Sequence, residues 1–442
     1  MNKSFTLCLL ALAVSATTVF GQQSSQPTAT PSRVTVTSTI PPSQSWTTPA
    51  PAPTTTPFPK PVKPAVVVGT ETFPSQASNL NYKGLSFSAI KQKLAEAKRQ
   101  MMSRPMTTAL TSPVQPNTPF PLPPGSMSST FPTPVVPAPS LVRIAYYDWR
   151  TRSVEYITVT KDAFLTANSI TAAISSNGKT VTSRTIRANG VNTPVEILDN
   201  GQQQLPLMIQ YPVEKNGRFI ETAYYMSTHP GIITPEVVSA GRFYVKNTVD
   251  IAREKLQTKG YFIQPKVADI AERLATVEHV DHTRFRTEFQ PNIFNDIFTL
   301  YALNEGQTYR YSVSSAGAGG MVQMIPSTYS MVRSRYPNAA LMPDFVEGMR
   351  NHVNATQAML LYMQMTWNDL NASPTISNAL QTGLATPEQL MAAGYNSNPA
   401  KLARYIDRGG VGWTSLIPRE TQMYLQIFSS LERNVTLTPR KQ

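Results

Sequence analysis

The sequence predicts an α+β protein. A mostly α-helical C-terminal domain is expected, preceded by a small β-rich domain and a long disordered N-terminal region rich in Pro and Thr. Three observations predict this order. Of the 38 prolines, 23 fall before residue 140. Apolar and β-branched residues alternate over 141–230, which is typical of strands. From residue 234 onward the apolar residues recur at helical spacing.

The first 21 residues predict a secretory signal peptide. Lys3 gives a positive start, the apolar run over 5–20 is short for a membrane span, and small residues lie near Gly21. An uncleaved N-terminal anchor is the alternative. Cys8, the chain's one cysteine, lies inside this segment. The mature chain would therefore contain no disulfide, no thiol nucleophile and no Cys-based zinc site.

Residues 22–140 predict an extended linker, because Pro, Thr and Ser cannot bury enough apolar surface to offset chain entropy. A short amphipathic helix over 88–102 interrupts it, with Ser88 as the expected N-cap. Its other face is basic. Such a helix suits weak contact with an anionic membrane or wall, or docking on its own domain, and we favour docking.

The chain is basic, with a net charge of +13 and a pI of about 9.7. Basic proteins favour polyanionic partners. Export argues against nucleic acid, and aromatic residues do not interleave with Lys and Arg as they do on nucleic-acid surfaces. A cell-wall polymer that carries carboxylates fits better. A charge bias that serves solubility is the alternative.

Residues 141–232 predict a small β-rich domain. The stretches 142–147 and 154–159 form a hairpin around a turn near 150–153. Further strands are expected over 180–187, 195–198 and 207–211, with turns at Asn189-Gly190 and Asn200-Gly201. A binding module and a scaffold packed on the next domain both fit this domain, and no motif separates them.

From Thr234 the period becomes helical. Thr234 is the expected N-cap and Pro235 the first helical residue. Helices are expected over 235–258, 266–283, 292–304, 353–370 and 419–432. We divide this part into a helical connector, 233–285, and a mostly α-helical domain, 286–435. The second of these is long enough to bury its own core.

The segment from Asn304 to Thr328 combines an acid with a tight turn. Glu305 ends an apolar helical run, a Gly/Ala/Ser turn follows, and a second apolar run carries one glutamine. Phe298, Tyr301 and Ala302 lie one to two turns back. They predict apolar surroundings, which disfavour the charged form of a carboxyl group and keep its proton near neutral pH. A carboxyl group in that state can act as a general acid.

Three blocks of residues follow one another over about 120 residues. The first consists of Glu305, Ser314, Gly317, Ala318, Gly320, Met321, Val322, Gln323, Pro326 and Thr328. The second consists of Ala393, Gly394, Tyr395, Asn396 and Pro399. The third consists of Trp413, Ile417, Pro418, Glu420, Thr421 and Tyr424. Their order and spacing resemble the catalytic domain of soluble lytic transglycosylases, which belong to the lysozyme-like superfamily. The resemblance covers about a third of the chain.

The resemblance implies a lysozyme-like fold and a peptidoglycan lytic transglycosylase that needs no cofactor. Glu305 would serve alone as general acid and then as general base. The enzyme would cut the β-1,4 bond between N-acetylmuramic acid and N-acetylglucosamine and form 1,6-anhydromuramic acid. Its partners would be peptidoglycan glycan strands. Its place would be the periplasm or cell wall of a bacterium.

The resemblance also implies a set of substrate-binding residues. Tyr395 would hydrogen-bond near the catalytic acid and orient it. Ser314 and Gln323 would contact the N-acetyl and ring hydroxyl groups of the sugar. Asn396 would bind the sugar or hold its loop, and Glu420 would fix the wall of the groove from behind.

The run Glu278-His279-x-Asp281-His282 is dense in metal-ligating side chains. Its two histidines lie three residues apart, so the His-Glu-x-x-His pattern of zinc proteases is absent. We expect a polar helix face or an interdomain contact here and predict no metal site.

Two other functions compete with the transglycosylase. A hydrolase of the same superfamily would cut the same bond with water. A wall-binding or assembly protein with a degenerate site would not cut it. Gly306, where the family usually has Ser, and the altered loop at Tyr395 motivate that alternative. The sequence makes no prediction of oligomeric state.

Overall fold

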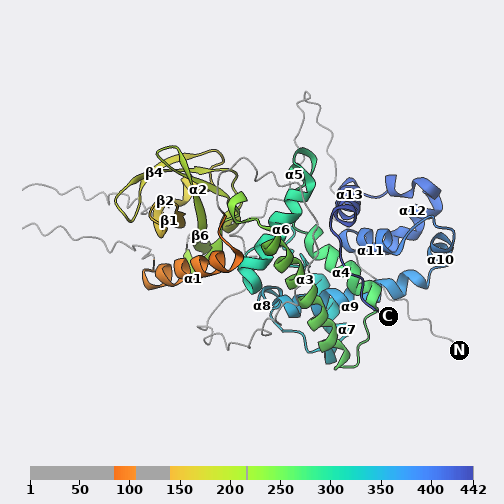
Figure 1. Ribbon diagram of the computed structural model, residues 1–442. Coiled ribbons are helices and arrows are strands. Elements are labelled where there is room, and N and C mark those ends of the chain that lie inside the picture. The colour runs from red at the N-terminus through yellow and green to blue at the C-terminus, as the bar shows by residue number, and fades with distance from the viewer. Residues whose placement is uncertain (1–83, 106–139, 216–217, 442) are drawn as a thin grey trace, which may run out of the picture. The chain divides into compact units, whose positions relative to one another are not determined.

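The computed structural model describes residues 84–105, 140–215 and 218–441. The predicted signal peptide and most of the predicted linker lie outside the described residues. The described chain is mixed α and β, with a curled sheet followed by a helical part (Figure 1). This confirms the α+β prediction at that level.

The sheet has seven antiparallel strands. They are β1 (Leu141–Asp148), β2 (Ser153–Thr160), β3 (Ile170–Ile174), β4 (Thr180–Thr185), β5 (Val195–Asp199), β6 (Gln202–Lys215) and β7 (Arg218–Met226). The hydrogen-bonded order is β2-β1-β6-β5-β4-β3, and β7 pairs with β6. The sheet curls until its two outer strands approach, since Ser176, just after β3, donates its backbone N–H to the carbonyl of Tyr156 in β2 at 2.9 Å.

The predicted strands are present where apolar and polar residues alternate strongly in the sequence. The hairpin of β1 and β2 pairs Leu141 with Thr160, and β5 and β6 contain two of the other predicted strands. The strand predicted over 180–187 is β4, which ends two residues earlier, at Thr185. Asn200 and Gly201, both with positive φ, form the predicted turn between β5 and β6. The strands β3 and β7 were not predicted. Their side chains are mostly exposed or half-buried, which leaves no clear apolar pattern to read.

The predicted helix in the linker is present as α1 (Phe87–Ser103). Its N-cap is Ser86, whose hydroxyl accepts the N–H of Ala89, so the cap predicted at Ser88 was wrong by two residues. The apolar side of α1 is buried, and the carbonyl of Met101 accepts from the side chain of Gln210 in β6. The helix therefore docks on its own sheet, as expected.

The helical part continues to the C-terminus. Its α-helices are α3 (Pro235–Gln257), α4 (Pro265–Val277), α5 (His282–Thr287), α6 (Gln290–Asn304), α7 (Pro326–Arg335), α8 (Phe345–Arg350), α9 (His352–Asn371), α10 (Pro374–Gln381), α11 (Pro387–Asn396), α12 (Leu402–Gly409) and α13 (Arg419–Asn434). The short α2 (Lys161–Leu165) lies within the sheet region. The 3₁₀ turns are η2 (Gly190–Asn192), η3 (Pro230–Ile232), η4 (Glu305–Gln307), η5 (Pro337–Ala339), η6 (Pro399–Lys401) and η7 (Gly410–Ser415).

The single helix predicted over 266–283 is wrong, because the structure has two helices there. The helix α4 ends at Val277, and a new helix, α5, begins at His282. The carboxylate of Asp281 accepts the N–H groups of Thr283 and Arg284 at 2.8 and 2.9 Å. An acid that satisfies these two orphan donors starts a helix instead of continuing one.

The core of the helical part surrounds α6. This helix packs on α3, and α3 also packs on α9 and α4. Phe294, Phe298 and Tyr301 of α6 are almost fully buried. Such a helix end is held firmly in place, and the residue that follows α6 is Glu305. None of the described helices is both long and apolar enough to cross a membrane.

Candidate functional site

Glu305 terminates α6 in an unusual backbone conformation. Its φ is 45° and its ψ is −127°, and its N–H still donates to the carbonyl of Tyr301. The carbonyl of Glu305 accepts both the N–H and the hydroxyl of Thr308, at 2.9 and 2.8 Å. The turn after the helix is therefore fixed by hydrogen bonds on both sides of Glu305.

The same conformation occurs at the end of α12, where the residue is Gly410 with φ 49° and ψ −127°. Glycine adopts these angles without strain, whereas a residue with a Cβ pays about 1–3 kcal/mol. A glutamate at a glycine-type position points to a need for its side chain. Strain of this kind clusters at functional sites.

The carboxylate of Glu305 is exposed, and its side chain retains 58% of its accessible surface. Its ion-pair partner is Lys91 of α1, whose ammonium lies 3.4 Å from Oε1. The expected apolar surroundings are therefore wrong for the free protein. Phe298 and Tyr301 point into the core, and because α6 ends at Asn304, Glu305 does not continue their face.

A buried network lies under the turn that carries Glu305. The ring of His352 lies between the hydroxyl of Tyr244, at 2.9 Å, and the carbonyl of Thr308, at 2.7 Å. Burial lowers the pKa of His352 to about 4, so the ring is neutral at pH 7. The network joins α3 and α9 to the turn. Sequence analysis missed His352 because an isolated histidine carries no spacing signal.

The turn is also tied to the sheet. The side-chain oxygen of Asn304 accepts the N–H of Met226 at the end of β7, at 2.9 Å. The hydroxyl of Tyr225 accepts the N–H of Tyr309 at 3.2 Å. The sheet thus contributes directly to the position of Glu305, which favours the scaffold alternative for the β-rich region.

The Gly/Ala/Ser segment forms a tight loop over residues 312–324. The backbones of Ser314 and Ala318 are joined by a hydrogen bond of 2.8 Å, and the hydroxyl of Ser314 accepts the N–H of Ala318 at 3.0 Å. Gln323 has a φ of 45°, and its amide donates to the carbonyl of Gly320 at 2.8 Å. In the free protein both predicted sugar-binding side chains bind their own loop.

Gly320 shows why the loop needs glycine. Its φ is 67°, and a Cβ there would lie 2.3 Å from the carbonyl oxygen of Met349. The loop therefore lies directly on the backbone at the end of α8. Any larger residue at this position would push the loop away.

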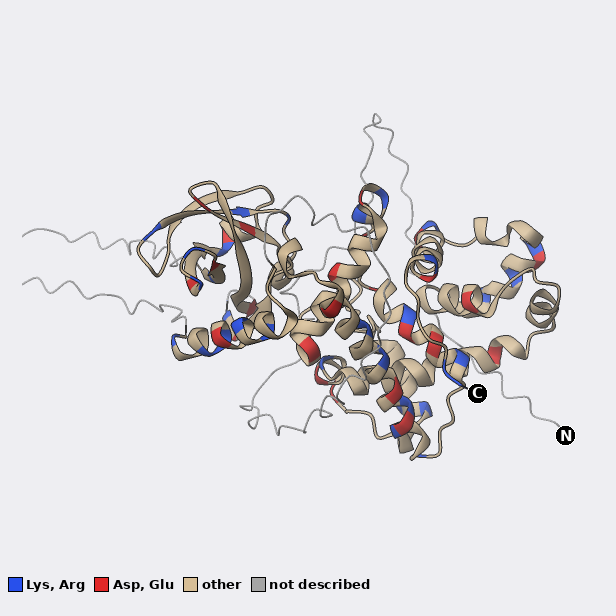
Figure 2. Ribbon diagram, viewed as in Figure 1, with Lys and Arg blue, Asp and Glu red and all other residues tan. Residues whose placement is uncertain are grey.

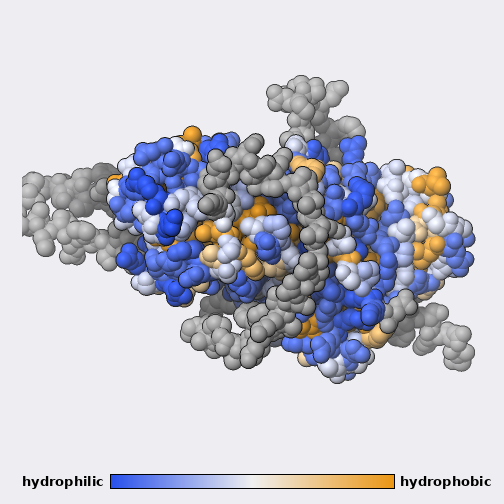
Figure 3. Space-filling view, viewed as in Figure 1, coloured by the Kyte–Doolittle hydropathy of each residue, from blue (hydrophilic) through white to orange (hydrophobic). Residues whose placement is uncertain are grey.

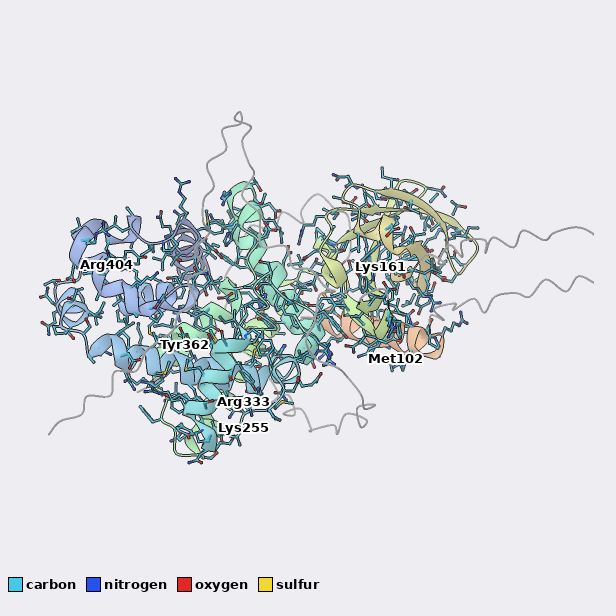
Figure 4. The ribbon with its side chains drawn as sticks, turned by 180° about the vertical axis from the view of Figure 1, so that it is seen from behind. Met102, Lys161, Lys255, Arg333, Tyr362 and Arg404 are labelled. Atoms are coloured by element: carbon cyan, nitrogen blue, oxygen red, sulfur yellow. The ribbon has the colours of Figure 1, made fainter. Side chains whose placement is uncertain are left out.

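The second and third blocks meet this loop. The hydroxyl of Tyr395 in α11 donates to the carbonyl of Val322 at 2.6 Å. The next side chain, Asn396, accepts the hydroxyl of Thr421 in α13 at 2.9 Å. Tyr362 of α9, labelled in Figure 4, lies edge-on to the ring of Tyr395 at 5.9 Å. Blocks far apart in the sequence are thus in direct contact.

The structure places two further predicted site residues. The hydroxyl of Tyr395 is bonded to the loop through the carbonyl of Val322. Glu420 lies exposed in the first turn of α13, where an acid suits the positive end of the helix dipole. Both residues belong to the blocks that carry the resemblance.

The acid-and-histidine run near residue 280 is divided between separate partners. His279 bonds to the carbonyl of Met321 at 2.9 Å, and its ring stacks on Tyr309 with centroids 3.4 Å apart. Buried Glu278 accepts the hydroxyl of Tyr424 at 2.7 Å. Within the described ranges no group of three or more such side chains is placed to hold a metal ion. This run therefore helps to hold the loop over residues 312–324 in place through His279.

Chemically, the candidate site offers one carboxylate on a strained, fixed turn, and the loop of small residues over 312–324 follows this turn in the chain. No protein-family model matches this chain, and no curated protein or solved structure does.

Proposed function

We propose that the protein is a peptidoglycan lytic transglycosylase and that its helical part is a lysozyme-like catalytic domain. The observation that carries the proposal is the glutamate at a glycine-type position, Glu305, at the end of buried helix α6. The contacts of Val322 with Tyr395 and of Asn396 with Thr421 support it, because they join the three blocks.

In the proposed reaction one carboxyl group acts twice. Glu305 gives its proton to the glycosidic oxygen as the bond from the muramoyl anomeric carbon breaks. The substrate's own N-acetyl group stabilises the positive charge on that carbon. The carboxylate of Glu305 then takes the proton of the muramoyl C6 hydroxyl, and the C6 oxygen closes the 1,6-anhydro ring. Glu305 ends protonated and no water is consumed.

The first proton transfer needs Glu305 in its neutral form. Bound sugar would remove water from the exposed carboxyl group and displace the ammonium of Lys91, and both changes disfavour the charged form. The exclusion of water that is absent in the free protein is then supplied by the bound substrate. The exported, periplasmic or wall-associated location belongs to the same proposal.

Mass spectrometry of the products released from purified sacculi tests the reaction. We expect 1,6-anhydro products from the wild-type protein and none from Glu305→Gln, with sacculus binding unchanged. Products heavier by one water would assign the protein to the hydrolases instead.

A non-catalytic wall-binding protein is the second candidate. The exposure of Glu305 and its pairing with Lys91 favour it, since a free general acid is commonly buried. If the wild-type protein binds sacculi but releases no soluble fragments, the wall-binding function is correct and the transglycosylase function is excluded.

A further inference from the structure

The helix α1 brings a distant part of the chain to Glu305. Lys91 and Glu305 are separated by 214 positions, yet their charged atoms lie 3.4 Å apart. The ammonium also lies 5.6 Å from the ring centre of Phe87, one turn earlier. A segment that precedes the sheet therefore contributes a side chain to the candidate site.

The docking of α1 is specific on its apolar side. Ile90, Leu94, Ala97 and Met101 are each at most 5% exposed. The helix end is held by the guanidinium of Arg143, which donates to the carbonyl of Arg104 at 2.6 Å. This apolar side is occupied by the protein's own sheet, so it is not available to insert into a lipid bilayer.

Outside its apolar side, α1 is exposed and cationic. Lys91 and Lys98 lie seven residues apart, which places them on the same face of the helix, and Arg99 follows Lys98 directly. Seven residues of α-helix correspond to about 10 Å along its axis. The fourth basic residue, Lys93, instead pairs with Glu96 of the same helix at 2.9 Å.

Few acidic side chains are available to pair with the cations on this face. Glu96 is the single acid of α1, and Figure 2 shows the basic positions distributed along the helix. Among the described residues Lys98 and Arg99 take part in no ion pair, and Lys91 pairs with Glu305 alone. In the view of Figure 3 the visible surface at the position of α1 is mostly hydrophilic. Met102, near the end of α1 and labelled in Figure 4, is a 56% exposed apolar residue.

We propose that Lys91, Lys98 and Arg99 form a cationic wall of the substrate site that binds the carboxylates of the stem peptides on the glycan strand. The inference rests on the proposed function and names the form of peptidoglycan that the site selects: strands that still carry their anionic peptides. When such a strand binds, the ammonium of Lys91 transfers from Glu305 to a substrate carboxylate. Glu305 is then released from its ion pair.

Charge complementarity favours this occupant. An exposed ion pair such as Lys91–Glu305 contributes only about 0–1 kcal/mol, so a substrate carboxylate can replace it at small cost. The continuity of the wall with Glu305 places the peptide stems beside the bond to be cut. A neutral strand without peptides would gain no binding energy from the cationic wall.

The experiment compares two substrates with the full protein: glycan strands that carry stem peptides and strands of the same length from which an amidase has removed them. The double variant Lys98→Gln/Arg99→Gln is expected to lose roughly tenfold in kcat/KM on the peptide-bearing strands and to keep its value on the bare strands. Its rate should also depend less on salt. Lys93→Gln, on the same helix but off the wall, is the matched control.

Equal losses on both substrates, or no loss on either, would overturn the cationic wall while anhydro products from the wild-type protein keep the proposed function. No products from the wild-type protein on either substrate would overturn both. Binding to vesicles of phosphatidylglycerol and phosphatidylcholine that the double variant loses, with unchanged strand selectivity, would assign the same cations to a membrane and end this proposal. Thermal unfolding of each variant confirms that α1 remains docked.

Discussion

The imidazole of His352 bridges the hydroxyl of Tyr244 and the carbonyl of Thr308, at 2.9 and 2.7 Å. A buried neutral ring thus joins helices α3 and α9 to the turn that carries Glu305. Thr308 passes this support on, since its hydroxyl donates to the carbonyl of Glu305. The geometry of the exposed acid depends on groups that no substrate touches.

The first prediction concerns the stability of this network at low pH. Burial lowers the pKa of His352 and of His229 to about 4, below the unfolded value of about 6.5. Above pH 6.5 both states are neutral and the histidines have no effect. As the pH falls from 6.5 to 4, the unfolded chain binds protons that the fold excludes, so stability decreases, by up to about 3 kcal/mol for each histidine.

Urea unfolding at several pH values measures this dependence. His352→Asn should flatten part of the slope between pH 4 and 6.5, while His282→Asn, at a partly exposed position, serves as the control. A wild-type stability that stays constant over this interval would contradict the assignment of buried neutral histidines.

The second prediction tests the backbone strain at the candidate acid. Glu305→Gly should raise the free energy of unfolding by about 1 kcal/mol relative to Glu305→Gln, because glycine adopts a φ of 45° and a ψ of −127° freely. Both variants should lose anhydro-product formation. Differential scanning calorimetry measures the shift.

The control for this prediction is the reverse change at the matched position. Gly410→Ala should destabilise the protein by about 1–2 kcal/mol, and since a Cβ there meets no atom within 4 Å, strain alone would cause the loss. A Glu305→Gly variant less stable than Glu305→Gln would show that the turn is not strained.

The third prediction concerns the loop over residues 312–324. Tyr395→Phe removes the hydrogen bond to the carbonyl of Val322, which should cost about 1 kcal/mol of stability and lower kcat roughly tenfold through displacement of the loop. Anhydro-product release under saturating substrate measures kcat. Tyr405→Phe on α12 is the control and should change neither value. An unchanged kcat in Tyr395→Phe would show that this hydroxyl stabilises the fold and has no effect on catalysis.

The fourth prediction concerns the C-terminal segment, which is fastened by a buried arginine. The guanidinium of Arg440 is 4% exposed and contacts Asp269 at 2.9 Å, Glu272 at 2.7 Å and Asp250 at 2.6 Å. Arg440→Ala leaves buried carboxylates without a cation and should cost about 3–5 kcal/mol in urea unfolding. The loss should shrink at acid pH, because burial already raises the pKa of Glu272. Arg433→Ala, an exposed control, should cost under 1 kcal/mol.

The sequence by itself determined the elements. Alternation over 142–159 predicts the β1–β2 hairpin, and the Thr234-Pro235 pair predicts the start of α3, because caps and periodicity are local properties of the chain. The order and spacing of the three blocks that contain Glu305, Tyr395 and Glu420 were also visible in the sequence. The α4–α5 break was missed, since one capping carboxylate, Asp281, outweighed the helical period.

Only the tertiary structure decided what surrounds the acid. Lys91 reaches Glu305 across 214 positions and His352 reaches Thr308 across 44. Neither contact produces a pattern in the local sequence. The packing of whole helices and strands sets the distance between residues that are far apart in the sequence. The exposure of Glu305 has the same origin: apolar neighbours one turn back along the chain fixed the core face of α6, and the reversed backbone at its end turned the carboxylate toward α1.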